Sequence, residues 1–368
     1  MTYFLIAGEA SGDLHAAALI TQLKSLDHSA RMVGLGGDRM AALGCRLYQD
    51  YRHMAFMGFV AVLQNLKAVC RNFHIAEQAL LEEKPDVLIL IDYPSFNLRM
   101  AAFCRQHLPQ TKIVYYIPPK VWAWKRWRVH KIAGLCDAVL GIFPFESAFY
   151  AKYGYNCTYV GNPTAEAINQ YIQNTPDAPK NTTIALLPGS RPSEVKHCLP
   201  RMLEAARCFP KYKIVVTAAP GLEDAFYTPY LRNGETLSRD TYSSVRQAKA
   251  AIVNSGTATL ETALLGCPQV AVYHLAWSRI IGILRPLMQN WIFAIPYFTL
   301  VNILAEKEVI KELVANDFIT NKITAELQKL LNDEMYQKNM LADYEHIHSI
   351  LSTSPASVTA ARIIMQMI

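Results

Sequence analysis

Two loops in the second half of the chain carry residues suited to phosphate chemistry. One reads LLPGSR over Leu186–Arg191, and the other reads NSGTATLE over Asn254–Glu261. Each follows a short apolar run and leads into a helix-like segment, so each offers backbone N–H groups at a helix N-terminus, where anions bind. Arg191 adds a guanidinium that suits a phosphate, and the Glu261 carboxylate could hold two sugar hydroxyls. Together the loops predict a pocket for a nucleoside diphosphate.

The predicted nucleotide-binding residues belong to both loops. They are Gly189, Ser190, Arg191, Ser255, Gly256, Thr257, Ala258 and Glu261. A capping box, Ser190 with Ser193 or Glu194, is the structural alternative, and both readings can hold because a capped helix N-terminus still attracts phosphate. The sequence contains no GxxxxGK[ST] loop and no GxGxxG placed between a strand and a helix.

Asp92 is the candidate general base. It closes the apolar run Val87–Ile91, which places a carboxylate at the carboxyl end of a predicted central strand. Partial desolvation at such a position favours proton abstraction. The alternative is a cap on the following turn, Tyr93–Ser95, and the spacing leaves both open.

A glycine-containing loop, GEASGD, directly follows the first predicted strand. Its candidate ligand-binding residues are Gly8, Glu9, Ser11, Gly12 and Asp13. Glycine at a strand-to-helix turn lets a ligand approach the backbone. The alternative is an ordinary turn in which Ser11 or Asp13 caps its own helix. A second glycine run, Gly34–Gly37, repeats this pattern after the next strand.

Two segments combine apolar and basic residues. The segment Phe56–Cys70 is predicted as a helix with a broad apolar stripe, either a buried core helix or an interfacial helix that contacts lipid. Its candidate lipid-contacting residues are Phe56, Met57, Phe59, Val60, Leu63 and Leu66. The run Val121–Arg128 places three tryptophans among three basic residues, which suits a membrane interface, a sugar-stacking element or a hinge between domains.

Short apolar runs that alternate with helical patterns predict an α/β fold with parallel sheets. The predicted strands are Tyr3–Ala7, Arg31–Gly34, Val87–Ile91, Lys112–Ile117, Ala138–Ile142, Thr158–Val160, Thr183–Leu187, Lys213–Thr217, Ala251–Val253 and Gln269–Tyr273. The proline-containing stretch 162–181 is predicted as a domain junction, and only helical patterns are predicted after about Glu306. Two doubly wound domains facing each other would place a ligand cleft between the carboxyl ends of their sheets.

The composition excludes several classes of protein. An apolar content of 52% over 368 residues argues against disorder, and a net charge of +6 is too mild for nucleic-acid binding. The uncharged stretch 286–305 is interrupted by Gln289, Asn290, Pro296 and Asn302, which argues against a transmembrane helix. We predict no metal site and no cofactor, because the sequence has no DxD triplet and no cluster with metal-ligand spacing.

Seven motifs in this order resemble the lipid-A-disaccharide synthase family, glycosyltransferases of Gram-negative bacteria. They are GEASGD, IDYPSFN, VWAWK, PFE, LLPGSR, SGTATLE and LVNILA. The resemblance covers nearly the whole chain and implies a GT-B fold of two Rossmann-like domains. It implies that UDP-2,3-diacylglucosamine donates its sugar to the 6-hydroxyl of 2,3-diacylglucosamine 1-phosphate, giving a β-1,6-linked disaccharide phosphate and UDP.

The resemblance also implies roles for particular residues. Asp92 matches the family's proposed catalytic aspartate, Arg191 its diphosphate-binding arginine and Asn302 an asparagine near the active site. The residues Ser255, Gly256, Thr257 and Glu261 match its nucleotide-binding loop and helix. Two positions depart from the family pattern: Ser95 stands where a second acid is common, and Pro118 where a serine is common.

The same resemblance implies a domain organisation. We predict an acceptor-binding domain over 1–165, a UDP-sugar-binding domain over 166–353, and a C-terminal helix over 354–368 that crosses back to the first domain. The predicted partners are the two acylated sugars and the cytoplasmic face of the inner membrane, which the protein would contact peripherally. A homodimer stays open. The rival functions are a nucleotide-sugar epimerase on the same fold and a non-catalytic module that binds a nucleotide or a membrane surface.

Overall fold

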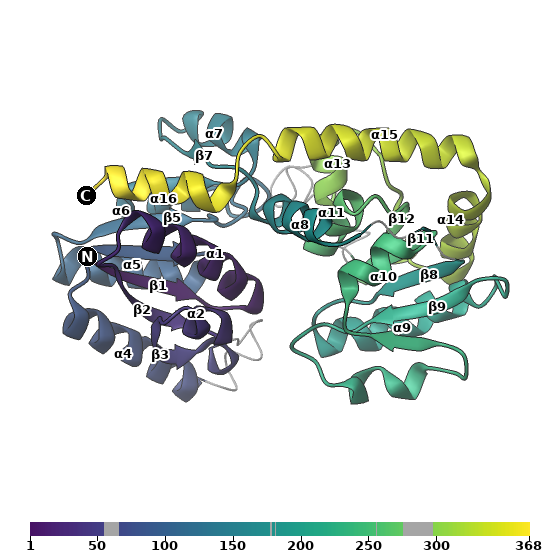
Figure 1. Ribbon diagram of the computed structural model, residues 1–368, viewed down its shortest axis with the longest axis horizontal. Coiled ribbons are helices and arrows are strands. Elements are labelled where there is room, and N and C mark those ends of the chain that lie inside the picture. The colour runs from purple at the N-terminus through teal and green to yellow at the C-terminus, as the bar shows by residue number, and fades with distance from the viewer. Residues whose placement is uncertain (55–65, 177–178, 181, 255, 275–296) are drawn as a thin grey trace. The chain divides into compact units, whose positions relative to one another are not determined.

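The computed structural model describes residues 1–54, 66–176, 179–180, 182–254, 256–274 and 297–368. The chain forms two compact units (Figure 1). The first contains residues 1–166 and 351–368, and the second contains residues 167–350.

The first unit is built on a seven-stranded parallel sheet with the order β3-β2-β1-β4-β5-β6-β7. Its strands are β1 (Thr2–Ala7), β2 (Arg31–Gly36), β3 (Arg46–Asp50), β4 (Val87–Ile91), β5 (Lys112–Tyr116), β6 (Ala138–Gly141) and β7 (Thr158–Tyr159). Every residue of the central strand β4 is buried, as expected where helices cover both faces of a parallel sheet.

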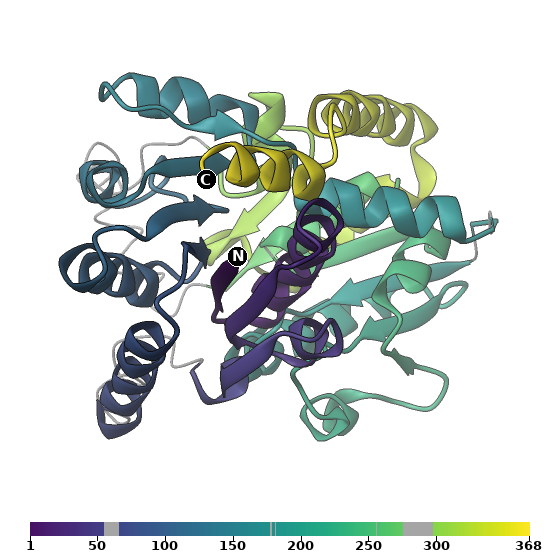
Figure 2. The ribbon, with the colours of Figure 1, turned by 60° about the vertical axis from the view of Figure 1, so that its left-hand side comes forward.

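Helices connect these strands. They are α1 (Ala10–Leu26), α2 (Asp38–Ala42), α4 (Leu66–Glu83), α5 (Pro94–His107), α6 (Arg128–Leu135) and α7 (Pro144–Ala151), with a 3₁₀ turn at Tyr51–His53. Helix α8 (Pro163–Asn174) follows β7, and the division between the two units falls within it, after Glu166. The last helix, α16 (Ala356–Gln366), belongs to this unit and packs on α1 (Figures 1 and 2). The Tyr3 hydroxyl lies 3.2 Å from Met365 Sδ, which ties α16 to the start of the sheet.

The second unit has a six-stranded parallel sheet with the order β10-β9-β8-β11-β12-β13. Its strands are β8 (Thr183–Leu187), β9 (Lys213–Thr217), β10 (Thr236–Ser238), β11 (Ala250–Asn254), β12 (Gln269–Tyr273) and β13 (Glu312–Val314). Its helices are α9 (Pro192–Ala206), α10 (Thr241–Gln247), α11 (Thr257–Leu264), α13 (Leu300–Ala305), α14 (Thr320–Asn332) and α15 (Glu334–Leu351), with 3₁₀ turns at Asp224–Phe226, Thr228–Tyr230 and Ala315–Asp317.

Each sheet reverses its winding direction once. In the first unit the chain runs outward from β1 to β2 and, in the opposite direction, from β4 to β5, so the reversal lies between β1 and β4. In the second unit it lies between β8 and β11. Ligands of open α/β sheets bind at such switch points, beyond the carboxyl ends of the strands. The loops after β1, β4, β8 and β11, which carry most of the predicted site residues, therefore flank a switch point of their own unit.

The predicted α/β fold with parallel sheets is confirmed, and all ten predicted strands are present. The prediction that only helices follow Glu306 is wrong, because β13 adds a strand beside β12. Two further strands, β3 and β10, were not predicted. All three lie at sheet edges, where a short strand pairs on one side only and needs no long apolar run.

Candidate functional site

Asp92 lies at the carboxyl end of β4, beside the switch point of the first sheet. Its backbone is left-handed, with φ of 45°, and so is that of Tyr93, with φ of 42°. The Asp92 amide donates to the carbonyl oxygen of Ile117 at 3.2 Å, and Ile117 is left-handed as well. Such conformations cost about 1–3 kcal/mol each for residues other than glycine, and they concentrate at functional sites.

Two buried side chains hold this strained turn in place. The Asn97 side chain donates to the carbonyl oxygen of Asp92 at 2.7 Å and to that of Ile91 at 3.2 Å. The Tyr115 hydroxyl donates to the same Asp92 carbonyl at 2.7 Å. Because these bonds use the backbone of Asp92, they leave its carboxylate available for a substrate.

The Asp92 side chain keeps an accessible surface, although much protein surrounds it. Desolvation raises the pKa of the carboxyl, while the nearby Lys120 ammonium and the Tyr93 amide lower it. Water screens these effects at an accessible group. A raised pKa at an accessible carboxyl favours a role as general base, because it strengthens the affinity of the carboxylate for a proton.

The glycine loop after β1 packs against the Asp92 turn. A Cβ on Gly8 would lie 2.3 Å from the Tyr93 ring, so only glycine allows this contact. Glu9 is half-buried and Ser11 is exposed at the same edge of the sheet, whereas Gly12 is buried.

Asp13 has a structural role. It is 3% exposed, and its carboxylate accepts hydrogen bonds from the amides of Gly37, Arg39 and Met40 at 2.8–3.2 Å. It therefore caps the N-terminus of α2, which follows the second glycine run. The N-cap residue of α1 is Glu9, and within the described ranges no side chain caps this helix, so the alternative in which Ser11 or Asp13 caps its own helix is wrong.

In the second unit, Gly189 brings the β8 and β11 loops together. Its φ is +116°, and an added Cβ would lie 2.4 Å from Glu194 Oε2 and 2.7 Å from Asn254 Nδ2. The Glu194 carboxylate accepts from the Ser190 amide at 2.9 Å and pairs with the Arg191 guanidinium at 3.1 Å. The predicted capping box is wrong, because the N-cap residue of α9 is Arg191 and makes no side-chain cap hydrogen bond; Glu194 instead accepts from the amide one residue before the N-cap. The Arg191 side chain is 50% exposed, so its charge can reach a ligand.

The β11 loop opens α11. Gly256 is its N-cap residue, and among the described residues no side chain caps the helix. Gly256 is exposed, and Thr257, the first helical residue, is also exposed, which leaves the helix N-terminus open to an anion. Ala258 follows within the first turn, and Ser255 lies outside the described residues.

Glu261 lies on α11, one turn beyond this loop. Desolvation raises the pKa of its half-buried carboxyl, and the hydrogen bond from Tyr242 lowers it. The Tyr242 hydroxyl is 3.4 Å from Glu261 Oε1, and the Tyr242 ring packs edge-on against Tyr171 with centroids 5.3 Å apart. Tyr242 was not predicted as a site residue, because nothing in the local sequence relates α10 to α11.

Asn302 lacks the solvent exposure that is expected of a residue that contacts substrate. It is fully buried on α13. Its amide oxygen accepts from the amides of Val309 and Ile310 at 2.8 and 2.9 Å, and its amide nitrogen donates to the Ile310 carbonyl and to Glu312 Oε1, each at 2.9 Å. Both donor hydrogens and both acceptor sites are therefore used within the protein.

Glu146 is a buried carboxylate that sequence reasoning did not single out. It is 1% exposed and accepts from the amides of Ile142 and Phe143 at 2.8 and 3.0 Å and from Trp122 Nε1 at 3.1 Å. Desolvation raises the pKa of its carboxyl to about 7, against these bonds and the Lys120 charge. The available signal was the PFE motif, in which a proline opens a helix and a glutamate follows in its first turn.

The predicted lipid-contacting residues cannot be placed. Phe56, Met57, Phe59, Val60 and Leu63 lie outside the described residues, and of Leu66 only the backbone, the first residue of α4, is described. Within the described ranges, no helix is both long and apolar enough to span a bilayer. Nor do three or more potential metal ligands of the His, Cys, Asp and Glu types converge in that part of the chain.

Comparison with known proteins shows where this arrangement recurs. Residues 3–364 match the family model described as lipid-A-disaccharide synthetase. The chain belongs to the lipid-A-disaccharide synthetase family. The lipid-A-disaccharide synthase of Trichlorobacter lovleyi is 34% identical over 99% of this chain and 97% of its own length, and that of Geobacter sulfurreducens is 33% identical over 99% and 96%.

Membership of the lipid-A-disaccharide synthetase family makes this chain a glycosyltransferase of lipid A biosynthesis. Solved structures agree in fold. A UDP-GlcNAc 2-epimerase from Methanocaldococcus jannaschii has a TM-score of 0.65 at 11% identity, with all of both chains covered. A kitacinnamycin glycosyltransferase has a TM-score of 0.62 at 11% identity, covering 99% of this chain and 97% of that one. The GT-B fold is thus shared by transferases and epimerases, and the fold by itself does not separate them.

Proposed function

We propose that this chain joins UDP-2,3-diacylglucosamine to the 6-hydroxyl of 2,3-diacylglucosamine 1-phosphate with inversion at the anomeric carbon. The products are a β-1,6-linked disaccharide 1-phosphate and UDP. Family membership supports this substrate pair. The observation that carries the mechanism is Asp92: an accessible carboxylate in a strained turn beside the first switch point, with its backbone held by Asn97 and Tyr115.

Asp92 acts as the general base. Its carboxylate takes the proton of the acceptor 6-hydroxyl as the hydroxyl oxygen attacks the anomeric carbon of the donor sugar. The new C–O bond forms on the face opposite the leaving group, and the bond between the anomeric carbon and the diphosphate oxygen breaks. The electron pair leaves with UDP, and the proton stays on Asp92. General-base assistance of this kind contributes about 10²–10⁴-fold.

The loops of the second unit stabilise the departing diphosphate. Arg191 and the N-terminus of α9 lie next to the N-terminus of α11, because β8 and β11 are neighbours. As negative charge develops on the departing UDP, its diphosphate would replace the Glu194 carboxylate as the partner of the Arg191 guanidinium. This exchange compensates the charge without a metal ion. Glu261 binds the ribose hydroxyls. We accordingly propose a UDP-sugar-dependent, metal-independent enzyme without a cofactor.

The substrates imply where the enzyme works. Donor and acceptor carry four acyl chains between them and reside in a bilayer, so the enzyme must reach the membrane surface. We propose peripheral association with the cytoplasmic face of the inner membrane, in part through the segment 56–66. The two acylated sugars are its principal partners.

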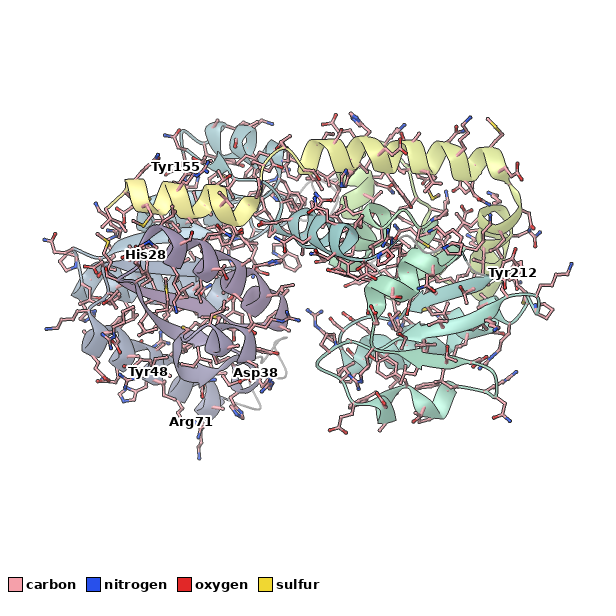
Figure 3. All side chains as sticks on the ribbon, viewed as in Figure 1. His28, Asp38, Tyr48, Arg71, Tyr155 and Tyr212 are labelled. Carbon is pink, nitrogen blue, oxygen red and sulfur yellow. The ribbon has the colours of Figure 1, made fainter. Side chains whose placement is uncertain are left out.

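One assay tests the function. UDP release from the diacylated UDP-sugar is measured with and without the diacylated acceptor phosphate, beside the disaccharide product. We expect release that depends on the acceptor and one disaccharide per UDP. Interconversion of the UDP-sugar without an acceptor would identify an epimerase, and binding of UDP without turnover would identify a non-catalytic module. Asp92→Asn removes the base, and Asp38→Asn is the matched control: Asp38, labelled in Figure 3, lies on α2 and is exposed.

A further inference from the structure

Four consecutive residues after β5, Trp124–Trp127, are all exposed. The side chains of Trp124 and Trp127 are 56% and 62% exposed, the largest fractions among the tryptophans and phenylalanines that the structure describes. Solvent exposure of two neighbouring tryptophans is costly, because each leaves a large apolar surface in water. The exposed pair therefore indicates a binding surface.

The sequence around the two tryptophans carries charge of one sign. Between residues 120 and 136 the sequence has five lysine or arginine residues and no aspartate or glutamate. Lys125 Nζ lies 5.5 Å from the centre of the Trp124 ring, and the Arg128 guanidinium lies 5.7 Å from that of Trp127. An occupant of this surface must therefore be anionic as well as able to accommodate indole rings.

The turn is already ordered. Trp122 is buried and donates to Glu146 at 3.1 Å, while the amides of Ala123 and Trp124 donate to the Lys120 carbonyl at 3.0 and 3.2 Å. The Arg128 amide donates to the Lys125 carbonyl at 2.9 Å. One tryptophan thus anchors the turn to the core while two point outward, so binding requires little further ordering of the backbone.

We propose that the turn Trp124–Trp127 is a docking surface for the headgroup region of an anionic bilayer. Tryptophan prefers the boundary between headgroups and acyl chains, where the ring is desolvated and its N–H stays hydrated. Clustered lysine and arginine side chains are attracted to anionic headgroups. This combination of indoles and cations matches a lipid surface better than it matches a neutral sugar.

A docking role for this turn rests on the proposed function in one respect, namely that the acceptor is an acylated sugar at the membrane surface. The turn follows β5, the neighbour of β4, and the Asp92 amide donates to Ile117 at the end of β5. Docking through this turn would therefore bring the proposed base to the membrane surface, where an acylated acceptor resides.

Vesicle binding tests the surface without requiring turnover. The full chain is sedimented with phosphatidylcholine vesicles that contain or lack phosphatidylglycerol. The variant W124A/W127A is compared with Phe226→Ala, a control that removes a 42% exposed aromatic side chain from the second unit. We expect the double variant to lose at least about tenfold in partitioning to the anionic vesicles and the control to match the parent. Melting curves should coincide, since the two side chains are exposed.

Activity assays separate the remaining outcomes. With a water-soluble short-chain acceptor, the double variant should turn over like the parent, whereas with vesicle-borne acceptor it should be slower. Unchanged vesicle binding would overturn the proposal. So would loss of turnover on the soluble acceptor with vesicle binding retained, because that result identifies a sugar-stacking element. If no variant and no parent shows turnover while the binding difference persists, the proposed function fails and the docking surface stands.

Discussion

Replacing Asn302 with alanine tests whether this residue supports the structure or contacts substrate. The substitution leaves three buried backbone groups without their partner: the amides of Val309 and Ile310 and the carbonyl of Ile310. Glu312 keeps its bonds from Phe298 and Thr299. An unsatisfied buried polar group costs about 1–3 kcal/mol. The free energy of unfolding should therefore fall by at least about 3 kcal/mol. This is a large part of the roughly 5–15 kcal/mol that is typical of a folded domain.

The measurement is urea unfolding followed by circular dichroism, combined with hydrogen exchange of the segment 300–314. The amides of Val309 and Ile310 should lose protection in the variant. Asn332→Ala is the matched control, because the Asn332 side chain is exposed and donates to the Gln328 carbonyl on its own helix; it should change stability by less than about 0.5 kcal/mol. If Asn302→Ala unfolds at the parent's urea concentration yet loses turnover, our structural interpretation is wrong and Asn302 contacts the substrate.

Four further predictions concern the proposed site. Asp92→Asn should lower turnover by about 10²–10⁴-fold without changing the melting temperature, and parent-like turnover at saturating substrate would refute the base assignment. Because desolvation raises the pKa of Asp92 and Lys120 lowers it, Lys120→Met should move the acidic limb of the rate profile to higher pH, and Lys120→Arg should restore it. Arg191→Ala should weaken UDP binding measured by calorimetry, with Arg191→Lys intermediate; equal affinities would place the diphosphate elsewhere. The raised pKa of Glu146 means that the folded state binds a proton more tightly than the unfolded chain, so its contribution to stability falls as pH rises from about 4.5 to about 7. Glu146→Gln should flatten the stability profile in that window, and an unchanged slope would contradict the assignment.

The family motifs and the central strands were predictable from the sequence for a local reason. A strand that is buried on both faces must be apolar throughout, and a loop that binds an anion must be small and polar, so both leave a pattern in consecutive residues. The runs Val87–Ile91 and Thr183–Leu187 have this form and became β4 and β8. Asp92 and Arg191 could be singled out because each directly follows such a run or its loop.

The partners of those residues could not be predicted, because they come from elements distant in the sequence. Asp13 was expected to bind a ligand or to cap its own helix, but the folded chain places it against the amides of α2, 24 residues away at Gly37. The three edge strands were missed because pairing with a neighbour, rather than their own apolar content, makes them strands.

The sequence by itself determined the family, the parallel α/β architecture and the residues that can do chemistry, since these depend on residue types and their spacing along the chain. Only the tertiary structure decided which side chains support others. It showed that all hydrogen-bonding groups of the Asn302 side chain are used inside the protein. It also showed that Glu146 anchors Trp122, while Trp124 and Trp127 stay exposed. Burial and partner geometry are properties of the folded chain, because they arise only when segments far apart in the sequence pack together.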